Sequence, residues 1–320
     1  MGINIEKQIP FTAVKKEKGI VFKRFYKERY LYFMSIPFVI WLVIFKYIPI
    51  WGWTMAFQEY FPMKGIFSQK WVGLKHFQAM FQDEQFYRVL RNTLAMSVLS
   101  LVANFIFAIL LALLLNEVRN ALFKRTIQTI SYLPHFVSWV IIAGMFSKLL
   151  STDGGVVNDL LVHLGVLKEP VQFLANEKLF WPIVTIVETW KETGWNSIIY
   201  LAAIAGINPE IYEAAIADGA GRFRKIWHIT LPSILPVIIV MLVMCIGWLV
   251  GNGFEKQFLM GNSLVQDYSQ VISLYVLQYG IGMGRYSYGT AVGIFQSVVS
   301  IILLFAANKV ARKYSEGGLI

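Results

Sequence analysis

The sequence predicts an all-α integral membrane protein with six transmembrane helices. Hydrophobic residues make up 57% of the 320 residues and the mean hydropathy is +0.56, which ordinary soluble domains rarely reach. Only 15% of the residues are charged, and the apolar runs reach the roughly 20 residues that a helix needs to cross a bilayer. Membrane-spanning strands would instead alternate over about ten residues. The six expected spans lie near residues 31–53, 93–115, 131–150, 181–205, 233–252 and 287–308.

The second and sixth spans are the clearest, because the run LAMSVLSLVANFIFAILLALLL in the second holds no charge. Between the first two spans, residues 58–92 read as an irregular or strand-like piece followed by an amphipathic helix with interfacial aromatics. Residues 151–180 open on the turn sequence STDGG, and residues 253–285 end in a glycine-rich stretch. The expected domains are a basic N-terminal tail (1–29), a six-span domain (30–310) and a C-terminal tail (311–320).

The formal net charge of +10 follows a membrane pattern and does not indicate nucleic acid. Eight Lys and Arg residues precede residue 30, and the loop 116–130, the loop 208–232 and the tail after residue 308 hold three each. The positive-inside rule predicts that these segments and both termini are cytosolic. We therefore expect a multi-pass protein surrounded by membrane lipid, with no nucleic-acid partner.

Catalytic signatures are missing from the sequence. It contains no GxxxxGK[ST], HExxH or GxSxG motif, and its four histidines lack the spacing of metal ligands. The single cysteine, Cys245, lies in the fifth span and is expected to be a buried thiol. We therefore expect a non-enzymatic chain with no metal and no cofactor of its own.

The segment 208–232, between the fourth and fifth spans, is longer than a helix connection requires. The run Asn208-Pro209-Glu210 offers an N-cap, a proline at the first helical position and an acid in the first turn, which predicts a short helix. That helix is expected to end near Gly219, and Pro232 is expected to begin the fifth span. Joining antiparallel helices needs only a few residues. The residues leave two interpretations open, a basic interfacial hairpin and a docking element for a soluble partner.

The motif in this loop reads Glu213-Ala214-Ala215, three residues, Gly219, nine residues, Ile229, one residue, Leu231-Pro232. It resembles the EAA signature of the permease subunits of bacterial ABC importers. The resemblance implies a coupling helix that docks on a separate ATP-hydrolysing subunit, where Glu213 pairs with a basic residue. The residues assigned to ATPase coupling on this basis are Glu213, Ala214, Ala215, Asp218, Gly219, Gly221, Ile229, Leu231 and Pro232.

The resemblance covers nearly the whole chain. The run TGWNSIIYLAAIAGINPEIYEAAIADGAG is similar to the carbohydrate-uptake branch of these permeases. The run YIPIWGWTMAFQEYFPMKGI, followed by WVGLKHF, resembles permeases for aldouronate, pectic or alginate oligosaccharides. The chain departs from the family in having Trp51 and Trp53 around Gly52, and it has no large extra external domain. The resemblance implies a second homologous permease, two copies of a cytosolic ATPase that hold ATP and Mg, and an extracytoplasmic solute-binding protein.

Two groups of polar and aromatic residues at membrane depth are candidates for a substrate pathway. In the fourth span, four residues share one helical face and a fifth is adjacent, and a similar mixture recurs at the end of the fifth span. Charges at this depth face a bundle interior or an aqueous path, and a structural Glu188–Lys191 ion pair is the alternative. The candidate residues are Glu188, Lys191, Glu192, Trp195, Asn196, Trp248, Asn252 and Glu255.

Together these features predict the transmembrane permease subunit of an ATP-driven importer in a bacterial cell membrane. It would move oligosaccharides from a binding protein into the cytosol. The alternative is a secondary transporter or channel for a polar solute, which would need an ion relay in several spans, although only the fourth is clearly charged. A membrane-bound enzyme of glycan assembly would need an acid–base or metal constellation that the loops do not offer.

Overall fold

The computed structural model describes residues 27–251 and 253–314, in two parts that divide after Thr54. The predicted basic tail therefore lies almost entirely outside the described residues, as do Asn252 and the last six residues. The first part is one continuous helical run, formed by α2 (Arg29–Leu42), the π-helix η1 (Val43–Tyr47) and the 3-10 helix η2 (Ile48–Phe57), whose last turn enters the second part.

The second part contains all the other described elements. One short antiparallel pair, β1 with β2, is its only sheet among the described residues. In chain order the elements are β1 (Gln58–Glu59), η3 (Ile66–Ser68), β2 (Lys70–Trp71), α3 (Lys75–Gln82), α4 (Glu84–Glu117), α5 (Ala121–Tyr132), η4 (Leu133–Phe136), α6 (Trp139–Leu149), α7 (Val156–His163), η5 (Phe173–Ala175), α8 (Glu177–Ala205), α9 (Pro209–Ala217), α10 (Arg222–Lys225), η6 (Ile226–Thr230), α11 (Leu231–Gly247), α12 (Phe254–Met260), η7 (Ser263–Val265), α13 (Gln266–Ser269), α14 (Ile272–Tyr275), η8 (Val276–Gly282) and α15 (Tyr286–Tyr314).

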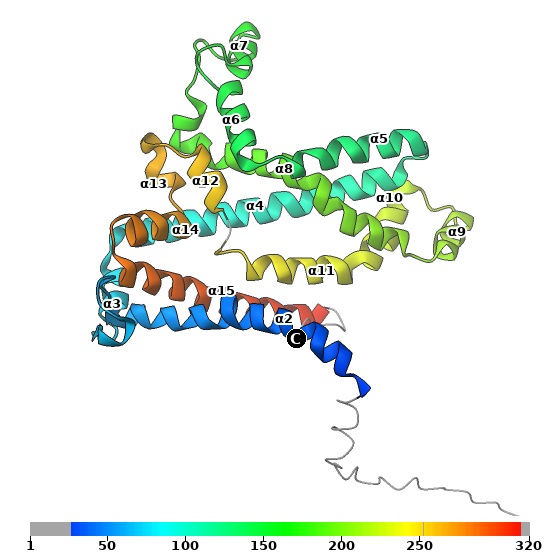
Figure 1. Ribbon diagram of the computed structural model, residues 1–320. Helices are drawn as coiled ribbons and strands as arrows, with labels where there is room; N and C mark the ends of the chain where they lie inside the picture. The colour runs from blue at the N-terminus through cyan, green and yellow to red at the C-terminus, as the bar shows by residue number, and fades with distance from the viewer. Residues whose placement is uncertain (1–26, 252, 315–320) are drawn as a thin grey trace, which may run out of the picture. The chain divides into compact units, whose positions relative to one another are not determined.

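Helices α4 and α8 form the centre of the second part, and no other pair of elements packs as extensively (Figure 1). Asp83 and Asn176 begin these helices as N-caps, each accepting a hydrogen bond from a backbone N–H two residues on. Small residues, Ala108 and Ala112, are buried where α4 approaches Tyr200 of α8. These caps and small residues position α8, which carries most of the predicted pathway residues.

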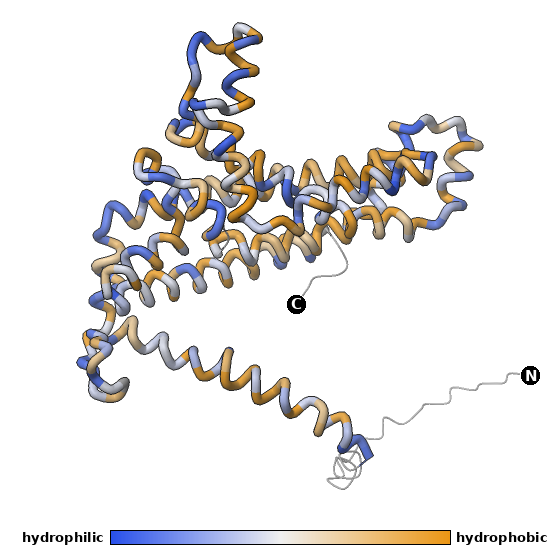
Figure 2. Tube along the Cα trace, turned by 45° about the horizontal axis from the view of Figure 1, so that its top comes forward, coloured by the Kyte–Doolittle hydropathy of each residue, from blue (hydrophilic) through white to orange (hydrophobic). Residues whose placement is uncertain are grey.

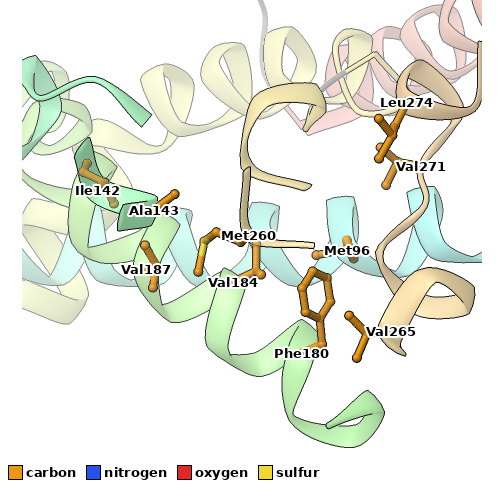
Figure 3. Close-up of a cluster of buried hydrophobic side chains, with 10 residues drawn as sticks. All are labelled: Met96, Ile142, Ala143, Phe180, Val184, Val187, Met260, Val265, Val271 and Leu274. Carbon is orange, nitrogen blue, oxygen red and sulfur yellow. The ribbon is translucent and has the colours of Figure 1, made fainter. Parts of the chain in front are cut away.

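A second apolar cluster joins α4 and α8 to the later, shorter helices. It is built from side chains of α4, α6, α8, α12, η7 and α14 together with Val271, and Phe180 and Val184 of α8 are fully buried in it (Figure 3). Each Å² of apolar surface that is buried stabilises the fold by about 25 cal/mol, so a cluster of this kind is the main force that holds short helices against long ones. The cluster therefore fixes α12 against α8.

The two ends of α4 carry different segments. The N-terminal end contacts α3, α13 and α14, whereas Glu117 at the C-terminal end pairs, at 3.8 Å, with Arg222, the first residue of α10 (Figure 1). Hydrophobic residues follow the middle of the long helices of this part, and hydrophilic residues gather near its ends (Figure 2). This distribution is the one expected of helices that cross a lipid layer.

Four helical runs among the described residues are long and apolar enough to span a membrane: Arg29–Phe57, Glu84–Glu117, Arg222–Gly247 and Tyr286–Lys313. They coincide with the predicted first, second, fifth and sixth spans. Helix α8 covers the predicted fourth span over 29 residues but is not among them, because Glu188, Lys191 and Glu192 lower its apolar character. The count of six spans therefore depends on α8 and on the third span.

The predicted third span, 131–150, is not one straight helix. The run Ala121–Phe136 and the helix Trp139–Leu149 meet at an angle of 101°. Val137 and Ser138 have extended backbone between them, and the Ser138 hydroxyl begins α6 as its N-cap. The sequence interpretation missed this break because the residues on both sides are apolar.

The fifth helix also differs from its prediction. It begins at Arg222 and continues through the π-turn η6 into α11, so Pro232 lies inside the helical run and does not begin it. A π-turn changes the hydrogen-bond register just before Pro232, which has no N–H to donate. The connecting loop is therefore shorter than the predicted 208–232.

Candidate functional site

The principal cavity of the second part has a volume of about 640 Å³ and is lined by α4, α6, α8, α11 and α12, together with Trp248, Leu249, Gly251 and Gly253. Of the residues predicted to form a substrate pathway, Glu188, Glu192, Asn196, Trp248 and Glu255 line it. Lys191 and Trp195 do not, and Asn252 lies outside the described residues. The structure thus brings together most of two groups that the sequence placed on separate helices.

Glu188 is buried in an ion pair, but its partner is not the one that the sequence suggested. Its carboxylate accepts hydrogen bonds from the Lys256 ammonium of α12 and the Ser100 hydroxyl of α4. The side chains of Glu188 and Lys256 are 8% and 6% exposed. The expected Glu188–Lys191 pair is therefore wrong, and the pair instead joins three helices at the wall of the cavity.

Lys191 has a different role, because it caps the break between η4 and α6. Its ammonium donates hydrogen bonds to the backbone carbonyl oxygens of Pro134, His135 and Val137, and the bond to Val137 measures 3.0 Å. Its side chain is 7% exposed. Carbonyl groups at a helix end need such partners when water is excluded. Lys191 therefore stabilises the 101° bend and does not line the pathway.

Glu192 and Trp195 are held by His135, which follows the proline of η4. The His135 Nδ1 lies 2.8 Å from the Glu192 Oε2, and the His135 ring stacks on Trp195 with centroids 4.5 Å apart and planes 2° from parallel. Glu192 is half-buried and faces the cavity. His135 thus fixes the direction of a carboxylate on the cavity wall.

The cavity also presents unpaired polar atoms and exposed rings. The Asn104 Oδ1 is buried and has no hydrogen-bond partner within the described part of the chain. Trp248, another lining residue, is 74% exposed, and Trp139 contributes a second ring. A buried acceptor without a partner is costly, so a ligand or water would satisfy it. Rings and amides are the groups that hold a sugar by its C–H face and its hydroxyls.

The loop between α8 and α10 is a rigid, exposed projection. Asn208 accepts a hydrogen bond from the Glu210 N–H at 3.1 Å and begins α9, as predicted from the sequence. Gly219 has φ +75°, and the Gly219 and Ala220 N–H groups donate to the Ile216 and Ala215 carbonyls. This is the Schellman ending, in which the left-handed position favours glycine. The predicted turn at Gly219 therefore has a backbone cause.

The residues assigned to coupling divide between this projection and the following helix. Helix α9 has no buried residue, and Glu213 is exposed with no ion pair or hydrogen bond in the described part of the chain. The Tyr212 hydroxyl lies 2.9 Å from the Thr230 Oγ1, which anchors α9 to η6. Glu213, Ala214, Ala215, Asp218, Gly219 and Gly221 lie on the projection, whereas Ile229, Leu231 and Pro232 lie on the continuous helix behind it.

At the other end of α4, Asp83 ties the short segments to α15. Its Oδ2 accepts hydrogen bonds from the hydroxyls of Tyr275, at 2.7 Å, and Tyr288, at 3.0 Å. Burial alone would raise the pKa of Asp83, but these bonds and the Gln85 N–H outweigh it and hold the pKa below its ordinary value. The packing at the N-terminal end of α4 therefore depends on the ionised carboxylate of Asp83.

No group of three His, Cys, Asp or Glu residues that could hold a metal ion occurs within residues 27–251 and 253–314. The site offers instead a cavity between apolar helices and an exposed helical projection at one end of the same helices. A cavity enclosed by long apolar helices is typical of a membrane transport subunit.

The comparisons with known proteins agree with this class. Residues 104–316 match the family described as "Binding-protein-dependent transport system inner membrane component", and the chain belongs to this family. The polygalacturonan/rhamnogalacturonan transport system permease protein YteP of Bacillus subtilis is 46% identical over 95% of this chain and 94% of its own length. The chain is thus a non-catalytic permease subunit of an ABC importer, whose ATPase is a separate partner, and not a secondary transporter.

Solved structures give the same result. A chain of a bacterial ABC transporter involved in the import of the acidic polysaccharide alginate is 42% identical, with a TM-score of 0.85 over 92% of this chain and 99% of that one. A chain of the alginate transporter in complex with an alginate pentasaccharide-bound periplasmic protein is 41% identical, with a TM-score of 0.87 over 93% and 99%. The predicted family is therefore confirmed.

Proposed function

We propose that this permease moves oligosaccharides, as polysaccharide fragments, from an extracytoplasmic binding protein into the cytosol. The names of the more similar relatives give polygalacturonan, rhamnogalacturonan, alginate or arabinooligosaccharides as the cargo, and more distant relatives are named for diacetylchitobiose, lactose or trehalose and maltose. A cavity of about 640 Å³ has room for an oligosaccharide segment rather than an ion, because drug-sized ligands occupy pockets of about 300–1,000 Å³. The proposal extends the family assignment to a substrate class.

In the membrane, α8 is the fourth of six spans and the bent pair α5–α6 is the third. The three charges of α8 are compatible with a span because Glu188 is paired, Lys191 caps carbonyls and Glu192 faces a cavity. Both termini and the α9 loop are then cytosolic, in a bacterial cell membrane, as the distribution of basic residues predicts.

The α9 projection is the coupling helix, and it is the strongest support for the proposed function. Its unpaired Glu213 offers a carboxylate to a basic residue of the ATPase, while Ala214 and Ala215 allow a close approach. The Schellman turn at Gly219 and the Tyr212–Thr230 bond transmit the motion of α9 to the fifth helix. ATP and Mg bind on two copies of the ATPase, and their closure moves the coupling helices of both permeases.

The cavity is this chain's part of the substrate pathway, with a second homologous permease forming the rest. Glu188, Glu192, Asn196, Trp248 and Glu255 contribute to its wall, and we retain Asn252 as a pathway residue from its position in the sequence. Alternating access is a shift between two packings of the helices, favoured in turn by ATP and by the loaded binding protein.

The test is ATPase binding and stimulation in the purified complex of both permeases and the ATPase. Glu213→Arg should abolish stimulation by the loaded binding protein, because it replaces an attractive charge with a repulsive one. Gly219→Val should weaken ATPase binding, because a β-branched residue at φ +75° is strained.

The matched control is Glu169→Arg, which makes the same charge reversal at an exposed carboxylate outside the α9 loop. It should leave ATPase binding and stimulation unchanged. A tight and fully stimulated complex that contains both Glu213→Arg and Gly219→Val would refute the coupling role. Transport that continues without ATP would refute the proposed function itself.

A further inference from the structure

A second, smaller pocket of about 290 Å³ lies beyond the principal cavity, among α12, η7, α13, α14 and η8. Helix α12 contributes to both. Phe254, Glu255 and Lys256 line the cavity, whereas Gln257 and Phe258 line the pocket. The cavity and the pocket are therefore neighbours that share one short helix, and the pocket's α13 and α14 pack against α4 (Figure 1).

The pocket has no charged lining residue. Amide and hydroxyl side chains form most of its wall, and the 53% exposed Phe258 adds an aromatic ring. Three glutamines form a chain in which the Gln85 Nε2 donates to the Gln270 Oε1 at 2.9 Å, and the Gln270 Nε2 donates to the Gln278 Oε1 at 2.8 Å. This chain holds the amide of Gln278, an exposed residue of the pocket wall, through its Oε1.

One hydroxyl on the pocket wall has no partner. Ser269 is 4% exposed, and no hydrogen bond of its Oγ occurs within the described part of the chain. Gly261 holds this hydroxyl close, because a Cβ on Gly261 would lie 3.0 Å from the Ser269 Oγ and 2.5 Å from the Gln257 carbonyl oxygen. A ligand hydroxyl that bonds to the Ser269 Oγ would add one hydrogen bond and so gain affinity.

We propose that this amide-lined pocket is a subsite for one sugar ring of an oligosaccharide whose other rings lie in the principal cavity. The inference rests on the proposed function. Neutral amides and a hydroxyl match sugar hydroxyls, and the Phe258 ring matches a C–H face. Because the pocket has no cation, it binds a hydroxyl-bearing part of the sugar and not a carboxylate. Its volume is at the lower end for ligand pockets, which suits a single ring.

The arrangement makes binding depend on chain length. Helix α12 has seven residues and is therefore about 10 Å long, so a ligand that reaches both hollows needs several rings. A disaccharide in the cavity leaves Ser269 unpaired, whereas a pentasaccharide reaches it. The pocket thus selects longer fragments, which the cavity alone does not.

The test uses cysteine protection in the complete transporter with its partner permease, ATPases and binding protein. Native Cys245 lines the cavity and reports occupancy there, and Gln278→Cys reports occupancy of the pocket. The probes are disaccharides and pentasaccharides of galacturonate, of alginate and of xylose. Each series is first tested for ATP-dependent uptake, and the series that is taken up is used for the protection measurement. The pentasaccharide should slow maleimide labelling at both cysteines at least threefold, and the disaccharide only at Cys245.

Ser269→Ala removes the unpaired hydroxyl and provides a second measurement. It should raise the pentasaccharide concentration for half-maximal protection about threefold to tenfold, the range for one hydrogen bond, and leave the disaccharide value unchanged. The control is Ser297→Ala, whose hydroxyl bonds to the Gly293 carbonyl of its own helix at 2.9 Å. It should change neither value.

The outcomes separate the two proposals. Suppose that the pentasaccharide is taken up and protects Cys245 but does not protect the cysteine at position 278. This result would overturn the proposed subsite and leave the proposed function standing. Equal effects of Ser269→Ala on the two sugar lengths would also overturn it. If no probe series gives ATP-dependent uptake, the proposed function fails and the subsite with it.

Discussion

The buried pair of Glu188 and Lys256 gives the sharpest prediction for stability. Lys256→Met removes the ammonium and leaves a carboxylate that is 8% exposed with only the Ser100 hydroxyl as a partner. Breaking a buried pair on one side costs about 3–5 kcal/mol. The adjacent cavity admits water, so we expect the lower end of this range, about 3 kcal/mol.

Replacing both partners should be far less harmful than replacing one. The double variant Glu188→Met with Lys256→Met buries two apolar side chains and no charge, so its loss should stay below about 1 kcal/mol. The assay is SDS-induced unfolding of the purified permease complex, from which the free energy of unfolding of each variant is obtained. The resulting double-mutant cycle measures the coupling of the pair.

Lys70→Met is the control, because Lys70 is an exposed base in the same part of the chain and should change stability by less than about 0.5 kcal/mol. If Lys256→Met costs no more than Lys70→Met, the ion pair does not stabilise the fold. If the double variant loses the sum of the two single losses, the charges are not coupled, and the reasoning from burial is wrong.

Two further predictions concern local contacts. Asp83 has a lowered pKa, so its stabilising hydrogen bond from Tyr275 is present above the ordinary value of 3.8 and is lost as the pH falls through the lower folded-state value. Below about pH 4, the thermal stability of the wild type should therefore fall more steeply than that of Asp83→Asn; equal slopes would contradict this. Gly194→Ala should cost about 1–3 kcal/mol, because its Cβ would lie 1.9 Å from the Ser131 carbonyl oxygen and force α5 from α8. Gly144→Ala, with open space around it, is the control for the same unfolding measurement, and equal losses would refute the close contact.

Local signals in the sequence predicted the coupling loop well. The Asn208 cap and the glycine turn at Gly219 are determined by neighbouring residues, and both appear in the structure where the spacing placed them. Pro232 misled the interpretation for the opposite reason. A proline usually marks the first turn of a helix, but here a π-turn on its N-terminal side accommodates it within a longer helix.

The partners of the charged residues could not be predicted from spacing on one helix. Glu188 and Lys191 are three residues apart and share a face, which suggested a pair. The hydrogen-bond partners of Glu188 lie 88 residues before it and 68 residues after it, and those of Lys191 lie 54–57 residues before it, although Lys191 also lies 3.7 Å from the neighbouring Glu192 carboxylate. Such contacts depend on which helices pack together, which no local pattern encodes. Lys256 was therefore missed, although it directly follows the predicted pathway residue Glu255.

The lysine that caps the bend has a consequence for biosynthesis. The Val137 carbonyl leaves the ribosome 54 residues before Lys191, the side chain that satisfies it. At translation rates of about 5–20 residues per second, the interval is roughly 3–11 s. During that interval the kinked segment has bare peptide oxygens and must stay near water, the translocon or a chaperone. Insertion of this region is thus completed only when the following helix arrives, so a ribosome stalled between the two would leave a nascent chain that is a target for quality-control proteolysis.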